Sequence, residues 1–424
     1  MKNIILLSLI LLLLISASCN TTEPPPPDGE KPTLELKLED VSCIEAWIEL
    51  TATNLQHPAT ITLKQFNPTG DTVTQNIILS NADSLLFIDS LLPNQTYKIL
   101  AAMQPYNNAS SELSVTTMDT TSHDFTFETF TFGGTAGSSS LYDVAIINEN
   151  NIWAVGEIYV ADTSINGYTK YNAVHWDGQI WELKKIAGHG EYPRRTVFAF
   201  SENDVWFDGG IKWDGVSYTV HMSGWPLMPN GDGWQINKMW GSSSSDLYAV
   251  GNNGNIAHYN GQSWSKIESG TDLNINDIWG ISDGNGGFNK YLAAYNAMLK
   301  LDANKNLSRI EAESGMHIFS IWGYTNQLIY VVGGENDALY KNYKWEIIND
   351  PLVNTLYRIK GQNYNDVFGI SSLGIILHFN GYNWGSINVP VENIFLKLDV
   401  KGNVISTVGW QGEKAVITII RRNN

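Results

Sequence analysis

Runs of alternating apolar and polar residues, separated by Gly, Pro and Asn, occupy the chain between residues 32 and 118. Segments 33–38 and 46–50 show the alternation most clearly. A period of two residues is typical of strands that bury one face. Several short strands at this spacing predict a β-sandwich over 32–118.

From residue 124 onward the hydrophobic pattern repeats with a period of about 40 residues. The clearest copy has apolar runs at 236–241, 246–251 and 256–259, and a fourth that begins at Trp264. Seven copies can be traced, and such a period indicates stacked units of four strands. The chain from 124 to 422 is therefore predicted to be a seven-bladed β-propeller in an all-β protein. A parallel β-helix is the alternative, although its repeats are usually shorter.

The last copy of the repeat is incomplete. It has apolar runs at 394–398, 404–409 and 415–420, and no fourth run. Segment 124–132, just before the first copy, alternates Phe with polar residues. We predict that this segment supplies the missing outer strand, because closing the ring removes sheet edges that would otherwise pair with other chains.

Local features recur at fixed places in the copies. Asp-Gly and Asn-Gly pairs are expected to supply the positive φ values of two-residue hairpin turns, and a Gly at the end of an apolar run is expected to let the chain bend out of the sheet. An aromatic residue three places after the turn Gly is expected to pack over the hairpin. A recurring His is expected to be structural, as is an Asp that accepts backbone N–H bonds before the second strand. The aromatic residues are Trp181, Tyr218, Trp264 and Trp384, the His residues are His175, His258 and His378, and the Asp residues are Asp204, Asp246 and Asp366.

The first residues have the features of an export signal. An apolar run at 4–15 is too short to span a bilayer as a helix. It is followed by Ser-Ala-Ser-Cys, which resembles the lipobox of bacterial lipoproteins and implies a signal peptide at 1–18 and a lipidated Cys19. The protein would then be an exported lipoprotein of the cell envelope, in the outer membrane, with the Pro-rich segment 19–31 as an extended tether. The alternative is an ordinary secretory signal in which Cys19 has no role.

A second resemblance lies inside the predicted sandwich. The segment from Leu91 through Pro93 to Tyr97 resembles the Leu-x-Pro-x-x-x-Tyr corner of fibronectin type III modules, and Trp47 matches the core Trp of that family. The resemblance implies a fibronectin type III-like domain over 32–118. Such modules are usually spacers or adhesive units, so a spacer is expected and direct ligand binding is the alternative.

The repeat array is similar to the broad bacterial group of propellers related to Kelch and Asp-box proteins, through its aromatic-Asp/Asn-Gly-x-x-Trp turn, as at 176–181. The turn lacks the Ser and the spacing of the Asp box, and the chain lacks the Phe-Arg-Ile-Pro segment of sialidases, so no glycosidase function is carried over. Zinc-spaced Cys/His clusters, HExxH, phosphate loops and GxSxG elbows are also missing from the sequence. We therefore predict no metal, no cofactor and no catalytic residue, and favour a binding protein over an enzyme.

The charge of the chain restricts its partners. There are 26 Lys and Arg against 43 Asp and Glu, a net charge of −17. This charge repels phosphate backbones and anionic lipid surfaces. Nucleic acid is therefore not expected as a partner, and the membrane is expected to be reached through the lipid anchor only.

Insertions that break the repeat are the candidates for function, because insertions in propellers map to loops on one face. They lie at 157–171, 188–195 and 221–234. Their aromatic, Arg and Glu side chains suit binding of a glycan or of an envelope or extracellular protein. The candidate binding residues are Tyr159, Tyr168, Tyr171, Glu191, Tyr192, Arg194, Arg195, Trp225 and Trp234. The alternative is that these aromatics only pack the loops down.

Two other functions stay open on the sequence alone. One is a polysaccharide hydrolase or lyase with its site at the mouth of the propeller channel, which would require paired carboxylates there. The other is a structural role in envelope assembly, which would require a stable protein partner.

Overall fold

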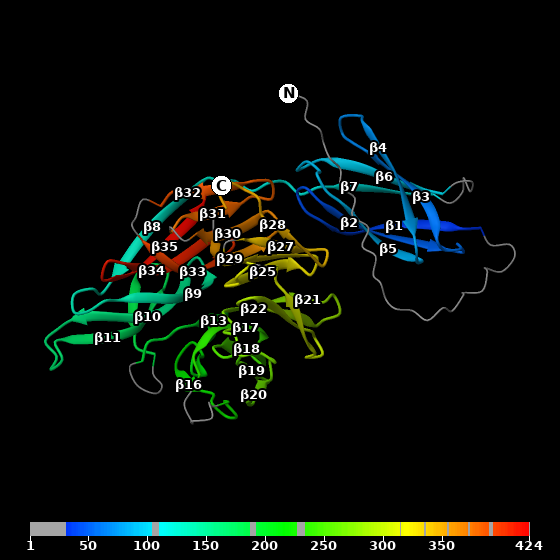
Figure 1. Cartoon of the computed structure of the whole chain (residues 1–424). Helices are drawn as coiled ribbons and strands as arrows, with labels where there is room; N and C mark the ends of the chain where they lie inside the picture. The colour runs from blue at the N-terminus through cyan, green and yellow to red at the C-terminus, as the bar shows by residue number, and fades with distance from the viewer. Residues whose placement is uncertain are drawn as a thin grey trace. The chain divides into compact units, whose positions relative to one another are not determined.

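The computed structural model describes residues 31–103, 110–186, 192–226, 234–313, 315–334, 336–353, 356–371, 374–389 and 393–423. The predicted signal peptide, Cys19 and the tether up to residue 30 lie outside these residues. The chain divides into two compact units, one built on the strands between residues 33 and 116 and the other on the strands between 125 and 422 (Figure 1). Over the described part of the chain, no helix has the length and apolarity needed to cross a membrane.

The first unit is a sandwich of two antiparallel sheets. One sheet has the order β1-β2-β5 and the other the order β4-β3-β6-β7. The strands are β1 (Thr33–Val41), β2 (Ala46–Thr53), β3 (Ala59–Phe66), β4 (Thr72–Leu79), β5 (Asp83–Ile88), β6 (Thr96–Ala102) and β7 (Ser110–Thr116). Alternate residues of both sheets form one apolar core. The Leu92 backbone N–H donates to the Tyr97 hydroxyl at 2.8 Å, which ties the loop before β6 to the strand itself.

The second unit consists of seven four-stranded antiparallel sheets, which we number blade 1 to blade 7. Blade 1 contains β9 (Ser140–Asn148), β10 (Asn151–Ala161), β11 (Tyr168–Trp176) and β12 (Trp181–Lys184). Blade 2 contains β13 (Val197–Ser201), β14 (Asp204–Phe207), β15 (Ile211–Trp213) and β16 (Tyr218–Val220). Blade 3 contains β17 (Ile236–Ser243), β18 (Asp246–Gly251), β19 (Ile256–Tyr259) and β20 (Trp264–Ile267).

Blades 4 to 6 follow the same order. They are β21 (Asp277–Ser282), β22 (Phe288–Ala294), β23 (Ala297–Leu301) and β24 (Leu307–Glu311); β25 (Ser320–Thr325), β26 (Leu328–Val332), β27 (Ala338–Lys341) and β28 (Lys344–Ile347); and β29 (Leu356–Asn363), β30 (Asp366–Ser371), β31 (Ile376–Phe379) and β32 (Trp384–Ile387). The first strand of each blade contacts the first strand of the next, and β33 of blade 7 contacts β9 of blade 1. The inner strands therefore form a closed ring around one axis.

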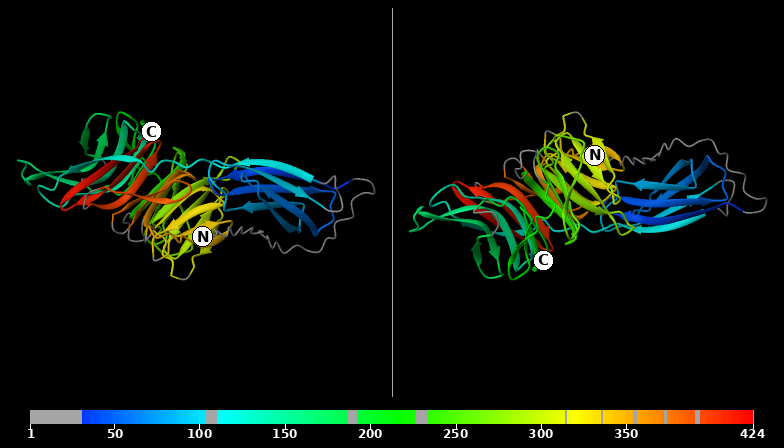
Figure 2. Two further views of the ribbon diagram at one scale, coloured as in Figure 1. Left: turned by 90° about the horizontal axis from the view of Figure 1, so that it is seen from above. Right: turned by 90° about the horizontal axis from the view of Figure 1, so that it is seen from below.

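Blade 7 joins the two ends of the ring. It contains β33 (Ile394–Lys401), β34 (Val404–Gln411), β35 (Lys414–Arg422) and, as its outer strand, β8 (Phe125–Phe132). β8 pairs antiparallel with β35 along its whole length, from Ala415 opposite Phe132 to Arg422 opposite Phe125. Figures 1 and 2 show the cyan-green β8 beside the red strands at the end of the chain. The prediction that segment 124–132 closes the propeller is confirmed.

The Trp-Gly pairs of the inner strands explain how neighbouring blades pack. A Cβ added to Gly280 in blade 4 would overlap the ring of Trp240 in blade 3. A Cβ on Gly361 in blade 6 would lie 2.8 Å from the ring of Trp322 in blade 5. Gly280 and Gly361 lie inside strands β21 and β29, so the expectation that such a Gly bends the chain out of the sheet is wrong at these two positions, whereas Gly251 is the last residue of β18. They are needed because a Trp of the preceding blade occupies the space of their side chain.

The turns between the third and fourth strands differ in geometry from the expected two-residue turns. Trp176 is paired directly with Trp181, so the loop has four residues, and only Gly178 of the Asp-Gly pair has a positive φ, of 94°. Oδ1 of Asp177 accepts hydrogen bonds from the backbone N–H groups of Gln179 and Ile180, both at 2.8 Å. The Asp side chain thus fixes the turn while its own φ stays negative.

The aromatic residues after these turns pack as expected. Each lies against the aromatic residue opposite it on the third strand, with ring centroids 4.8 to 5.4 Å apart. The pairs are Trp176 with Trp181, Trp213 with Tyr218, Tyr259 with Trp264, and Phe379 with Trp384. The prediction that these side chains cover the hairpins is confirmed.

The recurring His and Asp residues belong to the packing of the blades. Each His ring lies against the aromatic residue opposite it, with centroids 4.2 to 4.6 Å apart, for the pairs His175 with Trp153, His258 with Tyr248 and His378 with Phe368. Asp246 and Asp366 bind Nε2 of His258 and His378, at 2.8 and 3.1 Å. The expectation of backbone N–H partners for these Asp residues is therefore wrong, because a His one strand away reaches the carboxylate first.

Replacement of Phe130 by Ala should weaken the closure of the ring. Its ring centroid lies 6.1 Å from that of Trp176 and 5.7 Å from that of Trp181, and losing these contacts should lower the free energy of unfolding by about 2 kcal/mol. Urea unfolding of the full chain, followed by Trp fluorescence, reports on the propeller because Trp47 is the single Trp before residue 124 among 15. Phe127 on the same strand is 38% exposed, and its replacement by Ala should cost less than about 1 kcal/mol. Equal losses for the two variants would contradict this role of β8.

Acidification should destabilise the propeller through His378. Burial lowers the pKa of His378 below its ordinary value of 6.5, although Asp366 raises it, and His123 and Arg422 lower it further. The unfolded chain therefore binds more protons than the folded chain as the pH falls below 6.5, and stability falls in that window. Urea midpoints of the full chain between pH 7.5 and 5.5 should fall less steeply for His378→Gln than for the parent. The control His57→Gln, in the sandwich, should keep the parent slope for the propeller transition.

Candidate functional site

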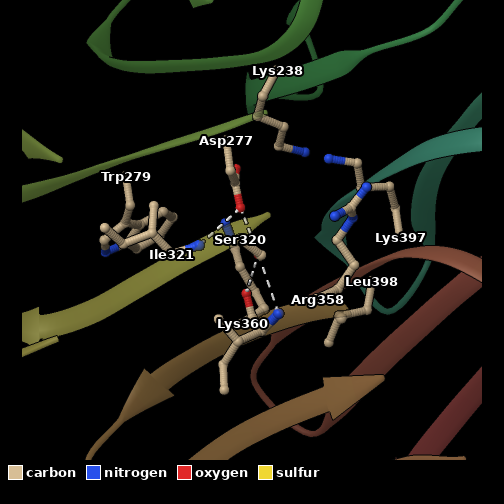
Figure 3. Close-up of a pocket in the computed structure, with 10 residues that line it drawn as sticks. Lys238, Asp277, Trp279, Ser320, Ile321, Arg358, Lys360, Lys397 and Leu398 are labelled. Atoms are coloured by element: carbon tan, nitrogen blue, oxygen red, sulfur yellow. Dashed lines mark hydrogen bonds between the residues drawn. The ribbon is translucent and has the colours of Figure 1, made fainter. Parts of the chain in front are cut away.

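On the inner strands, one residue of each strand has a side chain that faces the axis of the propeller. Five inner strands contribute to a small cavity of about 20 Å³ there, through Lys238, Asp277, Ser320, Arg358 and Lys397. Most of these side chains carry a charge, and Figure 3 shows that Lys238, Arg358 and Lys397 point into the same space. The axis is therefore a channel with a polar lining.

Carboxylates on the axis fasten one blade to the next. Asp277 of blade 4 accepts from the hydroxyl of Ser320 at 2.6 Å and from the N–H of Ile321 at 3.2 Å, both in blade 5. Asp399 of blade 7 accepts from the N–H of Ile146 in blade 1 at 2.8 Å. These carboxylates are used as structural acceptors.

Asp143 makes the same kind of link and also forms a buried ion pair. It accepts from the hydroxyl of Thr196 and the N–H of Val197 in blade 2, and lies 2.8 Å from Nζ of Lys238. Burial raises the pKa of Asp143, but Lys238 and Lys397 lower it more strongly, so the net pKa is below its ordinary value. Burial lowers the pKa of Lys238, but Asp143, together with Asp277 and Asp399, raises it above its ordinary value. Both groups are thus charged at neutral pH.

Among the described residues, no carboxylate forms an ion pair with the remaining cations of the channel. Arg358 donates through Nε to the carbonyl of Leu396 at 3.0 Å, and through Nη1 to those of Tyr357 and Phe319 at 2.8 and 3.3 Å. Nζ of Lys360 lies 3.8 Å from the ring centroid of Trp279 across the channel. Positive charge is therefore in excess at this point of an acidic protein.

Lys397 is the extreme case among these cations. Its side chain is buried, and within the described residues no hydrogen bond to its ammonium group is found. Burial lowers the pKa of Lys397 to about 7, with further lowering by Arg358 and Lys238 that Asp277 and Asp143 offset only in part. Burial is thus the main cause of the low pKa of Lys397, and the two neighbouring cations add to it.

The channel opens at the end where the inner strands begin, which we call the channel face. A cavity of about 160 Å³ lies there, and its lining residues are Tyr142, Arg195, Gln235, Ile236, Asn237, Asn276, Arg358, Leu396 and Lys397. None of these residues is acidic. The guanidinium group of Arg195 lies over the ring of Tyr142, 5.2 Å from its centroid, at the edge of this mouth.

Large apolar side chains surround the mouth. Tyr295 is stacked on His317 with ring centroids 4.4 Å apart, and Phe319 is stacked on Tyr357 at 5.8 Å. Tyr295 and Tyr357 are exposed, as is Ile394, which is 50% exposed. These residues form an apolar rim over blades 4 to 7, next to the positive channel.

The predicted site residues of blade 1 are brought together. The hydroxyl of Tyr159 donates to Glu157 at 3.2 Å, its ring lies edge-on to that of Tyr168 at 5.4 Å, and Nζ of Lys170 lies 5.1 Å from its centroid. Tyr171 packs on the core between blades 1 and 7. Glu157 also accepts from the hydroxyl of Tyr142, which connects this cluster to the channel mouth.

The other predicted residues divide into exposed and buried groups. Tyr192 is 68% exposed and Arg195 reaches the mouth, but Arg194 is buried and donates through Nη1 to the carbonyl of Asp208 at 3.1 Å. Trp225 and Trp234 are stacked on each other at 5.3 Å, and both belong to the core under blade 3. Glu191 lies outside the described residues. The eight predicted residues that the structure describes therefore do not form one cluster.

Sequence reasoning missed the channel residues and the rim over blades 4 to 7. Their signal was present in the repeat itself, because the residue two places before the Trp of the inner strand is Lys238, Asp277 and Ser320 in successive blades. Arg358 holds the same place before Lys360, which replaces the Trp. A comparison of the copies position by position would have found this variable polar position among apolar ones.

The fold and this channel define the chain as an all-β protein with a β-propeller. No family model and no curated protein matches it. Among solved structures, YCF48 bound to D1 peptide has a TM-score of 0.51 and 15% identity, and the match covers 70% of this chain and 95% of that chain. The Pan2 WD40 domain of Neurospora crassa has a TM-score of 0.48 and 12% identity over 72% of this chain and 97% of that chain. BamB from Moraxella catarrhalis has a TM-score of 0.37 and 10% identity, and the match covers 71% of this chain and 98% of that chain. At these identities, the likeness to YCF48 supports the fold alone.

Breaking the Asp143–Lys238 pair should strongly destabilise the propeller. In Asp143→Ala the ammonium of Lys238 stays buried without its partner, and the free energy of unfolding should fall by about 3–5 kcal/mol. The double variant Asp143→Ala/Lys238→Met removes both charges and should be less destabilised than the single variant. Urea unfolding of the full chain gives both values. A double variant no more stable than the single one would show that the pair is not the main cause.

Proposed function

We propose that this chain is an interaction protein of the cell envelope that binds a protein partner on the channel face of its propeller. The observation that carries the proposal is the positive mouth of the channel, which has no carboxylate in its lining and is bordered by exposed apolar side chains. Aromatic and Arg side chains that surround a desolvated centre are typical of protein interfaces. YCF48, which has a similar fold, is described as bound to a D1 peptide, and this supports a peptide or protein as the kind of partner.

In this proposal the first unit is a spacer. The lipobox-like sequence would anchor the chain through Cys19, and the tether and a fibronectin type III-like sandwich would hold the propeller away from the membrane. The two sheets, β1-β2-β5 and β4-β3-β6-β7, and the bond from Leu92 N–H to the Tyr97 hydroxyl support the fibronectin-like assignment. Cys43 is buried, and burial raises the pKa of its thiol to about 11, which supports a packing role for it.

A polysaccharide hydrolase or lyase is not favoured at this site. Paired carboxylates would be needed at the mouth. Asp143 and Asp277 lie deeper on the axis, where each accepts hydrogen bonds from the next blade. Binding without turnover therefore agrees better with the channel.

Site-specific photo-crosslinking in the native cells tests the proposed face. A photoreactive amino acid in place of Tyr192 or Tyr357 should give the same crosslinked protein, because both side chains are exposed at the channel end. Matched control positions are Val216 and Ile180, which are 86% and 58% exposed in turns between third and fourth strands. These turns lie at the opposite end of the blades, so the product should be absent there. A product obtained equally from the controls, or a glycan in place of a protein, would overturn the proposal.

A further inference from the structure

We propose that the channel mouth is a receptor for a single carboxylate of the protein partner, which Arg358 and Lys397 bind, with Arg195 at the entrance. The carboxylate comes from an acidic side chain or from a chain terminus. This inference rests on the proposed function and names the chemistry by which the channel face recognises its partner.

The first support is that the two cations are held with free donors toward one cavity. Three carbonyl groups fix the guanidinium group of Arg358 through Nε and Nη1, and within the described residues Nη2 has no acceptor. The ammonium group of Lys397 likewise has none, and both side chains line the cavity of about 160 Å³. A carboxylate has two oxygens and can accept from both groups at once.

The second support is that the protein's own carboxylates cannot neutralise this point. Asp143 is occupied by Lys238 and by the N–H of Val197. Asp277 and Asp399 each accept a backbone N–H of the next blade. Removing any of them from these bonds would leave buried donors without acceptors, which is costly. Burial is the main cause that lowers the pKa of Lys397 to about 7, and Arg358 and Lys238 lower it further while Asp277 and Asp143 raise it.

The third support is the shape and polarity of the neighbourhood. Arg358 also lines an adjoining cavity whose walls include Tyr357, Ile394, Phe395 and Leu396. Ser371, Gly374 and Asn393 complete its lining, and the apolar part of the wall can receive an aliphatic or aromatic side chain of a peptide. The partner is therefore expected to present an acidic group next to an apolar residue.

The fourth support is the charge of the whole chain. A net charge of −17 repels extended polyanions over most of the molecule, whereas a single charge can enter a local positive site. A nucleic acid or polyphosphate chain is thereby disfavoured. One compact carboxylate at the end of an apolar segment meets both conditions.

The test uses short peptides and the full chain, purified in an uncharged detergent and labelled with 13C-lysine. The probes are acetyl-Ala-Glu-Phe-amide, its Gln analogue, and acetyl-Ala-Ala-Phe with a free carboxyl terminus. Binding is followed by NMR of the Lys397 signal, which is assigned by its loss in Lys397→Met. We expect the Glu peptide, the free terminus or both to bind at least about tenfold more tightly than the Gln peptide, and to raise the pKa of Lys397.

The variants separate this site from general surface charge. Lys397→Met should weaken binding of the Glu peptide at least about tenfold, as followed through the remaining lysine signals. Lys266→Met should leave binding unchanged, because Lys266 lies on the outer strand β20 and is paired with Glu268. If neither the Glu peptide nor the free-terminus peptide binds the parent protein more tightly than the Gln peptide, the inference is overturned whether or not any variant folds.

Two further outcomes are distinguished from these. Glucuronate that binds more tightly than the Glu peptide would overturn a protein source for the carboxylate in favour of an acidic glycan. A partner that still crosslinks at Tyr357 in Lys397→Met, together with binding of both carboxylate peptides no tighter than that of the Gln peptide, would leave the proposed function intact and refute the carboxylate receptor alone. If the crosslinking fails but the carboxylate peptides bind as expected, the proposed function is refuted and the carboxylate receptor stands.

Discussion

The pairing of β8 with β35 is the interaction on which the rest of the propeller depends. It joins residues 125–132 to residues 415–422, so that the seven blades form a ring and not an open stack. Only in a closed ring do the inner strands β33 and β9 meet, and only then does Asp399 reach the N–H of Ile146. Closure also packs the faces of blades 1 and 7 against each other, and β8 covers the edge of β35 that an open array would expose. The axis exists because the two ends of the array pair with each other.

A closed ring of inner strands imposes a second constraint, which concerns the side chains that lie along its axis. Side chains there meet those of several blades, so each polar group needs a partner. The carboxylates satisfy this need by accepting N–H groups of the next blade, as Asp277 does from Ile321. The cations are only partly compensated, and the axis is positive in a chain whose net charge is −17. The charge along the axis therefore depends on the hydrogen bonds that link neighbouring blades as well as on the groups at the exposed mouth.

The fold could be predicted from the sequence because its signals are local and repeated. The alternating Phe residues of 124–132 indicate a single strand pairing. The aromatic residue after each Asp-Gly turn depends only on neighbours within one hairpin. Turn geometry was predicted less well, because the carboxylate of Asp177 binds two backbone N–H groups and so replaces the expected dihedral pattern. The number of strands followed from the period, whereas the details of each turn depended on side-chain chemistry.

The site was harder to predict because it is assembled across blades. Lys238, Arg358 and Lys397 lie in three different copies, and each stands in an inner strand that is otherwise largely apolar. The loops of blades 1 to 3 gave a stronger sequence signal, yet within them Arg194 is buried and Arg195 reaches the mouth, although the two residues are adjacent. Successive side chains of an extended segment point to opposite sides, and sequence alone does not tell which side is solvent.

The position of Lys397 also bears on why polar side chains line the channel. A buried ammonium group without a partner lowers stability, and an apolar side chain of similar volume would pack there at less cost. Natural proteins keep such violations mainly where function requires them. The other polar groups of the axis are explained by the bonds that they make between blades, but Lys397 makes none within the described structure. In the proposed function a carboxylate of the partner completes the bonding of Lys397, which is why the proposal places the partner at the channel mouth and not at the packed aromatic loops.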